Sequence, residues 1–320
     1  MSHQLVTVTP VASTLTVPAA VAELGEEAAE AFVDFFTVTI RNRNTRTAYG
    51  RAAGGFLTWA EQIGVGLREV RPVHVAAYVE ELAGRRSPAT VKQHLAALRM
   101  LGDFLTVRQV LKSNPAANVK GPSHVVRVGK TPVMEGADAK ALLASIDAST
   151  PAGVRDKALI GLMIYTFGRV SAVVNLKAGD VYQVGRVMKV MFREKGGRQH
   201  EMPLHHSAAE YLDDYLDRAG RPTDGPLFRS IDRRRVGYTD RPMGRNDAWK
   251  MVKRRCRQAG IGDRFNNHSF RATGITQYLK NGGQLEHAQH MAGHAKPETT
   301  KLYDRRQQET TLDEVERIVL

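Results

Sequence analysis

Residues 114–133 constrain the fold of this chain most strongly, because neither a helix nor a strand can run through them. Their sequence, NPAANVKGPSHVVRVGKTPV, contains three prolines and two glycines and lacks helical periodicity. Such a composition is typical of a linker, and 320 residues are enough for two domains with cores of their own. We therefore expect a flexible tail at 1–24, a first domain at 25–115, a linker at 116–132 and a second domain at 133–320.

The first domain is predicted to be a helical bundle. An apolar stripe with steps of three and four residues follows the polar residue Asn44. Its members are Tyr49, Ala53, Phe56, Ala60 and Ile63. Segments 71–82 and 87–105 repeat the pattern, each with a proline in the first turn, and Ser87 is the expected N-cap of the second. With a further helix near 25–37, the bundle has four or five helices.

The second domain is predicted to mix helices with a small sheet. An apolar helix at 156–168 ends at Gly168, a residue type that commonly stops helices. Strict alternation at 188–193 then indicates a strand, and the Lys195-Gly-Gly turn leads to a second one ending at 204. Helices resume at 208–220 and 245–260. The expected fold class is mostly α with a small antiparallel β-sheet in the second domain (α+β).

Positive charge is concentrated in one stretch of the chain. The formal net charge is +13, and residues 229–257 contain eleven Lys or Arg against three Asp. Dense cationic side chains attract polyphosphates, through counterion release as well as direct pairing. We favour duplex DNA as the partner, although RNA, an anionic membrane surface or a merely solvated basic face would give the same charge pattern.

The helix at 245–260 offers one face for packing and another for such a partner. The packing stripe is Trp249, Val252, Cys256 and Ala259. The cationic stripe, at i, i+3, i+4 and i+7, is Lys250, Lys253, Arg254 and Arg257. This helix suits docking on a phosphate backbone or in a groove, and a solvated amphipathic face is the alternative. Further candidate DNA contacts are Arg46, Lys92 and Arg198.

The sequence also indicates the cellular compartment in which the protein is expected. A single cysteine, Cys256, cannot form an internal disulfide, which fits a reducing compartment. No apolar stretch approaches the ~20 residues of a membrane span, and the N-terminus lacks the basic start and apolar block of an export signal. We expect a cytoplasmic protein that associates with the nucleoid through DNA and not with a membrane.

Six side chains from four segments could perform chemistry. They are Arg169, Lys195, His268, Arg271, His294 and Tyr303. Each has an ordinary explanation on its own, such as an arginine at a helix end, a hairpin lysine, a capping histidine or a core tyrosine. Together they favour phosphoryl transfer, because two guanidiniums can bind the non-bridging oxygens of a phosphodiester bidentately and stabilise a pentavalent transition state.

A tyrosine nucleophile suits reversible strand exchange. A phosphodiester on Tyr303 would retain the free energy of the bond, so that a DNA hydroxyl can displace it later. Either histidine could orient the phosphate or help with proton transfer, and Lys195 could protonate the departing 5′-oxygen. The sequence has no GxxxxGK[ST] loop, no HExxH and no Cys/His cluster with metal-ligand spacing. We expect chemistry that needs no ATP, no metal and no other cofactor.

Over roughly residues 27–310 the chain resembles the phage-integrase family of tyrosine recombinases. IYTFGRVSAVVNLKAGDV resembles the family's first-arginine box, and FREKGGRQHEMPL resembles its β-hairpin lysine segment. HSFRAT matches His-x-x-Arg, and MAGHAKPETTKLYDR matches the Gly-His…Tyr box with its nine-residue gap. The last two motifs, in this order and at this separation, are highly specific. The helical first half is similar to the family's core-binding (SAM-like) domain.

Three positions depart from the family's pattern. The first box usually has Gly-Leu before its arginine, whereas this chain has Phe167-Gly168 before Arg169. The family often has a glutamate three residues later, where this chain has Ala172, so support for the arginine must come from elsewhere, with Asp180 as the candidate. The residue after Arg271 is commonly histidine and is Ala272 here.

The resemblance implies a site-specific recombinase that integrates, excises or resolves DNA through a 3′-phosphotyrosyl intermediate. Two domains would clamp duplex DNA at inverted-repeat core sites, and a homotetramer would form on synapsed DNA, with accessory proteins where a system needs them. The tail TTLDEVERIVL has its apolar residues at helical spacing. Family members bury such a tail in a neighbouring protomer, and packing on its own domain is the alternative.

Two other functions fit parts of the sequence. A non-catalytic regulator would read 274–303 as a helix-turn-helix with GHAKPETTKLY as the recognition helix, which leaves Arg169 and Lys195 without a role. A type IB-like topoisomerase would use the same chemistry to relax supercoils without a specific site.

Overall fold

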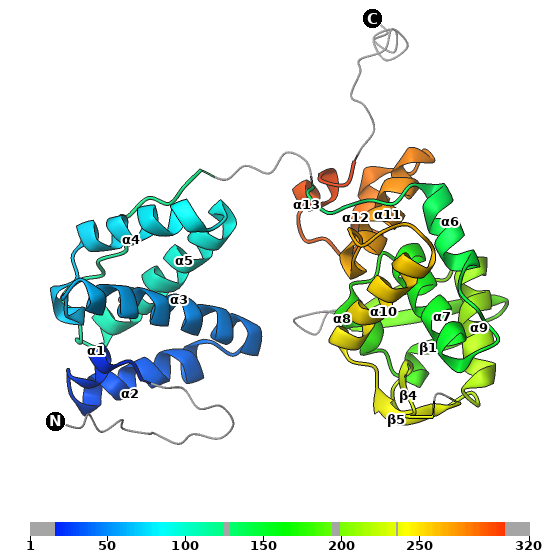
Figure 1. The fold of residues 1–320 in the computed structure, drawn as a ribbon, viewed down its shortest axis with the longest axis horizontal. Helices are drawn as coiled ribbons and strands as arrows, with labels where there is room; N and C mark the ends of the chain where they lie inside the picture. The colour runs from blue at the N-terminus through cyan, green and yellow to red at the C-terminus, as the bar shows by residue number, and fades with distance from the viewer. Residues whose placement is uncertain (1–16, 124–128, 194–198, 235, 305–320) are drawn as a thin grey trace, which may run out of the picture. The chain divides into compact units, whose positions relative to one another are not determined.

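The structure, a computed structural model, describes residues 17–123, 129–193, 199–234 and 236–304 (Figure 1). The chain divides into two compact units, residues 1–125 and 126–320. Helices dominate both, and the strands lie in the second. The predicted fold class, mostly α with a small antiparallel sheet, is therefore confirmed.

The first unit consists of helices only in its described part. They are α1 (Ala19–Ala22), α2 (Glu26–Asp34), η1 (Phe35–Thr39), α3 (Arg43–Gln62), η2 (Leu67–Glu69), α4 (Pro72–Arg85) and α5 (Pro88–Val107). The Asn42 side chain caps α3 by accepting from the amides of Asn44 and Thr45. Ser87 caps α5 as predicted, since its hydroxyl accepts from the amide of Thr90.

The core of the first unit extends beyond the range that the sequence predicted. Val17 and Val21 are buried in it, so the predicted tail at 1–24 is too long: its last residues pack because their valines cover the bundle. At the other end, Ala116 and Val119 are also buried, and the Arg99 guanidinium donates to both of their carbonyl oxygens. The bundle thus holds the first residues of the Pro/Gly-rich stretch.

The second unit combines helices with two small antiparallel sheets. The first sheet is β1 (Val181–Val184), β2 (Val187–Arg193) and β3 (Gln199–Pro203), and the second is β4 (Arg229–Ile231) and β5 (Tyr238–Pro242). The helices are α6 (Gly136–Ala144), α7 (Pro151–Tyr165), α8 (Val170–Val174), η3 (Ala178–Asp180), α9 (His206–Arg218), α10 (Arg245–Gln258), α11 (Asn267–Lys280), α12 (Leu285–Met291) and α13 (Pro297–Lys301). Val190 pairs with Met202 in β2–β3 and, with Phe192, faces the core.

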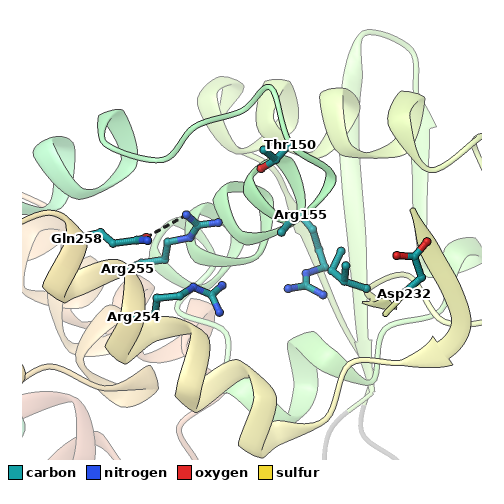
Figure 2. A pocket seen from close by; sticks show the side chains of 8 residues that line it. Thr150, Arg155, Asp232, Arg254, Arg255 and Gln258 are labelled. Carbon is teal, nitrogen blue, oxygen red and sulfur yellow. Dashed lines mark hydrogen bonds between the residues drawn. The ribbon is translucent and has the colours of Figure 1, made fainter. Parts of the chain in front are cut away.

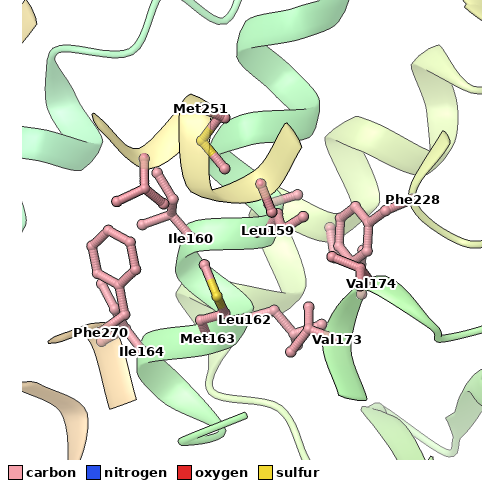
Figure 3. Packing of buried hydrophobic residues seen from close by; sticks show 14 of the residues in the cluster. Leu159, Ile160, Leu162, Met163, Ile164, Val173, Val174, Phe228, Met251 and Phe270 are labelled. Atoms are coloured by element: carbon pink, nitrogen blue, oxygen red, sulfur yellow. The ribbon is translucent and has the colours of Figure 1, made fainter. Parts of the chain in front are cut away.

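Helix α7 forms the centre of the second unit. It contacts α6, α8, α9 and α11, and its residues are buried on all sides, as Figure 3 shows for Leu159, Leu162 and Met163. This explains its nearly continuous apolar sequence.

The expected helix end at Gly168 is wrong, because α7 ends at Tyr165. The left-handed residue after the helix is Phe167, with φ of 54°. Gly168 is required for another reason. A Cβ on it would lie 2.6 Å from Cγ2 of Val173, so only glycine lets the chain turn this tightly into α8.

A buried carboxylate ties the start of α7 to α10. Asp156 is fully buried, and Arg155 donates to its Oδ1 at 2.7 Å, while Arg254 and Arg255 donate to its Oδ2 at 2.8 and 3.0 Å. The three guanidiniums line a cleft of about 490 Å³ (Figure 2). Arg155 also donates to the carbonyl of Arg229 in β4, and Arg255 to Gln258. The two buried arginines thus direct their donors to groups of the protein itself.

We expect Asp156→Ala to lower the free energy of unfolding by about 3–5 kcal/mol, because it leaves buried guanidiniums without their counter-charge. Urea denaturation at neutral pH measures the change. The matched control is Asp263→Ala, since the exposed pair of Asp263 with Arg257 spans 3.5 Å and contributes at most about 1 kcal/mol. Equal effects of the two substitutions would contradict a structural role of the arginine cluster.

Candidate active site

Helix α11 carries two of the predicted site residues at its start. The Asn266 side chain caps it by accepting from the amide of His268 at 2.9 Å. Three residues on, Arg271 is only 2% exposed. Its guanidinium donates to the carbonyl of Phe167, in the turn after α7, and to that of Ala292 at 2.5 Å, after α12. One arginine therefore fixes three segments that are far apart in the sequence.

Close packing of α11 on α7 makes this arrangement possible. A Cβ on Gly274 would lie 2.1 Å from the carbonyl oxygen of Ile164 and 2.7 Å from the ring of Phe167. Any larger residue would push the helices apart. Gly274 lies one turn after Arg271, so the same close approach brings the guanidinium to the Phe167 carbonyl.

Tyr303 lies just after α13 and is 7% exposed. Its hydroxyl is 2.9 Å from Nε2 of His268. Its ring is stacked on that of His294, with an interplanar angle of 8° and a centroid distance of 5.8 Å. Its backbone is held as well, because the Thr276 hydroxyl of α11 donates to the Tyr303 carbonyl at 3.0 Å. Tyr303 is thereby held by both histidines, with its hydroxyl against His268 and its ring against His294.

Arg169 acts on the two histidines and on Tyr303 from a different element. It is the N-cap residue of α8, and it is exposed. Together with Arg271 it lowers the pKa values of His268 and His294 through its positive charge, and it opposes the rise in the pKa of Tyr303. Two arginines thus make the site strongly positive, as binding of a phosphodiester requires.

Burial is the main cause of the pKa shifts at the site. It lowers the pKa of His294 to about 3, with further lowering by Arg271, Arg169 and His268. Burial also lowers the pKa of His268, with Arg271 and Arg169 adding to the effect. Burial raises the pKa of Tyr303, opposed by Arg271 and Arg169. At neutral pH both histidines are therefore neutral, and Nε2 of His268 can accept the phenolic proton.

Stability should depend on pH through His294. In the unfolded chain a histidine binds its proton near pH 6.5, whereas in the fold its pKa is about 3. Between these values the unfolded state binds more protons, so the free energy of unfolding falls as the pH falls from about 6.5 toward 4. We expect His294→Gln to flatten this slope in urea denaturation. The same substitution at the exposed His287 is the control. If the free energy of unfolding of His294→Gln depended on pH as steeply as that of the parent chain, His294 would not be the cause of this pH dependence.

Two predicted site residues, Lys195 and Arg198, lie outside the described residues, as does the tail 305–320. The suggestion that Asp180 replaces the glutamate missing at Ala172 stays a prediction. The Asp180 carboxylate accepts from the amide of Lys177 and pairs with Arg193 at 2.5 Å.

The predicted faces of α10 need correction. Trp249 was expected to pack, yet it is 48% exposed, and Nζ of Lys253 lies 5.8 Å from its ring centroid. The packed residues are Ala248, Met251, Val252, Arg255 and Cys256. Arg254 pairs with Asp156 at 2.8 Å while its side chain remains 47% exposed, so its contact with DNA stays a prediction. Because Arg255 is buried against the Asp156 carboxylate, the packed face of α10 is shifted by about one residue from the expected stripe.

The remaining candidate DNA contacts differ in their surroundings. Lys250 and Lys92 are exposed. Lys253 also donates to the carbonyl of Asp263, and Arg257 pairs with the Asp263 carboxylate. Arg46 donates to the carbonyl of Ile40, where it closes the end of η1. The role of these five residues in DNA binding therefore stays a prediction.

The helix-turn-helix alternative does not fit the structure. Its proposed recognition segment, 293–303, contains only the short helix α13, and three of its side chains are buried. They are His294, Thr300 and Tyr303. Side chains that face the interior cannot read base edges in a groove.

Comparisons with known proteins show which family the chain matches. Residues 132–310 match the family described as "Phage integrase family", and residues 30–109 match "Phage integrase, N-terminal SAM-like domain". The chain is 30% identical over 275 residues to the tyrosine recombinase XerD of Xanthomonas axonopodis pv. citri, covering 82% of this chain and 86% of that protein. It is 27% identical to XerD of Listeria monocytogenes, covering 85% and 83%.

Solved structures show the same fold. The XerH recombinase bound to its difH substrate has a TM-score of 0.63 at 20% identity, over 86% of this chain and 79% of that one. A lambda integrase dimer bound to a COC′ core site has a TM-score of 0.64 at 17% identity, over 88% and 96%. None of the helices in the described part of the chain could span a membrane.

The family models and the relatives define the class, a site-specific DNA recombinase that uses a tyrosine. The chain belongs to the phage integrase family.

Proposed function

We propose that Tyr303 is the nucleophile of this recombinase, with Arg169, Arg271, His268, His294 and Lys195 as its catalytic partners. The observation that carries the proposal is the 2.9 Å distance from the Tyr303 hydroxyl to Nε2 of His268, beside two arginines that act on both groups. A nucleophile within hydrogen-bond reach of a neutral base and surrounded by phosphate-binding cations is what phosphoryl transfer requires.

The proposed reaction transfers a DNA phosphoryl group to Tyr303. Nε2 of His268 accepts the phenolic proton as the Tyr303 oxygen attacks the phosphorus of the scissile phosphodiester. The bond from phosphorus to the 5′-oxygen breaks, and Lys195 supplies the proton that this oxygen takes up. A 3′-phosphotyrosyl link and a free 5′-hydroxyl result. The hydroxyl of a partner strand then attacks the link, and the tyrosine is released, so no external energy source is consumed.

The two arginines stabilise the charge that builds up on the non-bridging oxygens. The guanidinium of Arg271 cannot rotate freely, because the carbonyls of Phe167 and Ala292 hold it. A donor fixed in advance costs no reorganisation during the reaction, which is the condition for strong transition-state stabilisation.

The proposed partner is duplex DNA with inverted-repeat core sites, bound by a homotetramer, with accessory proteins where direction must be set. DNA lies in the solved neighbours XerH–difH and lambda integrase–COC′. The net charge of +13 supports the same partner here. Association with the nucleoid would follow from DNA binding. The division into a first domain, a linker and a second domain at 133–320 remains part of this proposal, with a first domain whose core includes Val17 and Val21 at one end and Ala116 and Val119 at the other.

Exchange of the C-terminal tail between protomers would complete the tetramer. The tail has apolar residues at helical spacing: Leu312, Val315, Ile318 and Val319. A cavity of about 460 Å³ between β3, α11 and α12, lined by Met202, Phe167 and Met291 among others, is a suitable apolar acceptor. A chain shortened after residue 304 should still bind one core site, and sedimentation should show that it no longer forms tetramers on synapsed DNA. If the shortened chain formed tetramers to the same extent as the full chain, the proposed exchange of the tail would be contradicted.

A nicked suicide substrate tests the proposed function. Trapped protein–DNA adduct on a denaturing gel, formed only with specific sites, supports the recombinase. Adduct on any duplex would indicate a topoisomerase, and no adduct would indicate a non-catalytic DNA-binding protein. Mapping the position of the trapped link on the flanking DNA would also identify the core site.

A further inference from the structure

A buried hydroxyl lies directly behind His294 at the proposed site. Thr300, on α13, is fully buried, and its Oγ1 is 2.8 Å from Nδ1 of His294. Its backbone carbonyl accepts from the amide of Tyr303 at 2.9 Å. One residue therefore holds the histidine through its side chain and the tyrosine through its main chain.

The direction of the side-chain hydrogen bond follows from the surroundings of Thr300. Among the described residues, Nδ1 of His294 is the one hydrogen-bond partner of Oγ1. If Nδ1 carried the imidazole proton, the buried hydroxyl hydrogen would have no acceptor, at a cost of about 1–3 kcal/mol. The hydroxyl therefore donates, Nδ1 accepts, and the proton of the neutral ring sits on Nε2.

This tautomer matters because of where Nε2 points. It lies on the side of the ring away from Thr300, and among the described residues it has no hydrogen-bond partner. The ring itself is held parallel to that of Tyr303. A proton on Nε2 can thus be offered to a phosphate oxygen, whereas a proton on Nδ1 could not.

We propose that Thr300 is a positioning residue that sets the tautomer of His294, so that its Nε2–H donates a hydrogen bond to the scissile phosphate. The inference rests on the proposed function of the site. It goes beyond it by assigning a role to a residue outside the six that the family motifs indicate. Thr300 itself does not touch the reacting atoms.

Three variants of the full-length chain test the proposal. Thr300→Val keeps the shape and removes the hydroxyl. We expect it to slow single-turnover cleavage of a suicide substrate by about 10- to 100-fold, less than the roughly 10²- to 10⁴-fold effect of losing a proton donor, because His294 itself remains. Thr300→Ser keeps the hydroxyl and should stay within about threefold of the parent chain. Thr299→Val is the matched control, since this half-buried neighbour has no side-chain hydrogen bond in the structure's described part.

A spectroscopic readout separates tautomer control from general damage. In nitrogen-15 spectra of histidine-labelled protein, His294 should show protonated Nε2 and bare Nδ1, with the signal identified by its loss in His294→Gln. In Thr300→Val the two tautomers should mix. A proton on Nδ1 in the parent chain, or parental cleavage by Thr300→Val, would overturn the proposal. The spectra need no DNA, so they stand even if Tyr303 proves not to be the nucleophile.

Discussion

Tyr303→Phe is expected to abolish the covalent protein–DNA adduct while leaving DNA binding unchanged. The substitution removes only the hydroxyl oxygen, and loss of a nucleophile costs on the order of 10⁴-fold or more in rate. The ring stays, so its stacking on His294 and the hydrogen bond from Thr276 to the main chain are kept. Adduct on a nicked suicide substrate, separated on a denaturing gel, measures the first quantity, and a mobility shift measures the second.

Tyr278→Phe is the matched control for this experiment. Tyr278 packs in the same small core cluster as Tyr303, and its ring meets Phe167 edge to face. It should form adduct at the parental rate. An adduct in Tyr303→Phe that survives denaturation would show that another residue attacks the phosphate. Equal loss in both variants would point to damaged packing of the cluster instead.

Local patterns were sufficient to predict most elements of the fold. The helices of the first unit and the alternation in β2 depend on periodicity and on caps such as Ser87, which neighbouring residues determine. The prediction failed where distant residues decide. Arg255 packs inward because Asp156, far away in the sequence, supplies a buried counter-charge, and Trp249 is consequently exposed. An apolar stripe alone could not reveal this.

In the candidate site, too, local patterns predicted one part and packing between distant residues decided the other. Motif spacing identified the candidate residues, and the structure brings His268, Arg271, His294 and Tyr303 into one group. The groups that hold them were missed, because threonines and main-chain carbonyls carry no motif. Thr300 was visible only as one of two threonines between His294 and Tyr303. Its burial and its bond to Nδ1 depend on how α13 packs, which spacing does not express.

The turn around Phe167 illustrates why family patterns did not suffice. The family usually has glycine where this chain has Phe167, a position with φ of 54°. A bulky residue in this region is strained. Here the Phe167 ring packs beside Gly274 and Tyr278, and its carbonyl accepts from Arg271. The strain is thus offset by contacts that themselves form part of the site.

Arg271→Lys is expected to reduce the rate of cleavage by about 10²- to 10³-fold, the usual loss for a fixed transition-state donor. A guanidinium reaches the carbonyls of Phe167 and Ala292 with two different nitrogens. The single nitrogen of a lysine cannot span both and still face a phosphate. Charge is retained, so binding of DNA should change by less than about threefold, since one phosphate contact contributes little to total affinity.

Arg264→Lys provides the comparison for this last prediction. Arg264 is exposed, lies just before α11, and stacks on Phe265 with its guanidinium carbon 4.8 Å from the ring centroid. The same chemical change there should leave single-turnover cleavage near the parental rate. If Arg271→Lys also cleaved at that rate, positive charge alone would suffice at the site. The argument from the fixed geometry of the guanidinium would then fail, because a flexible ammonium would serve the phosphate equally well.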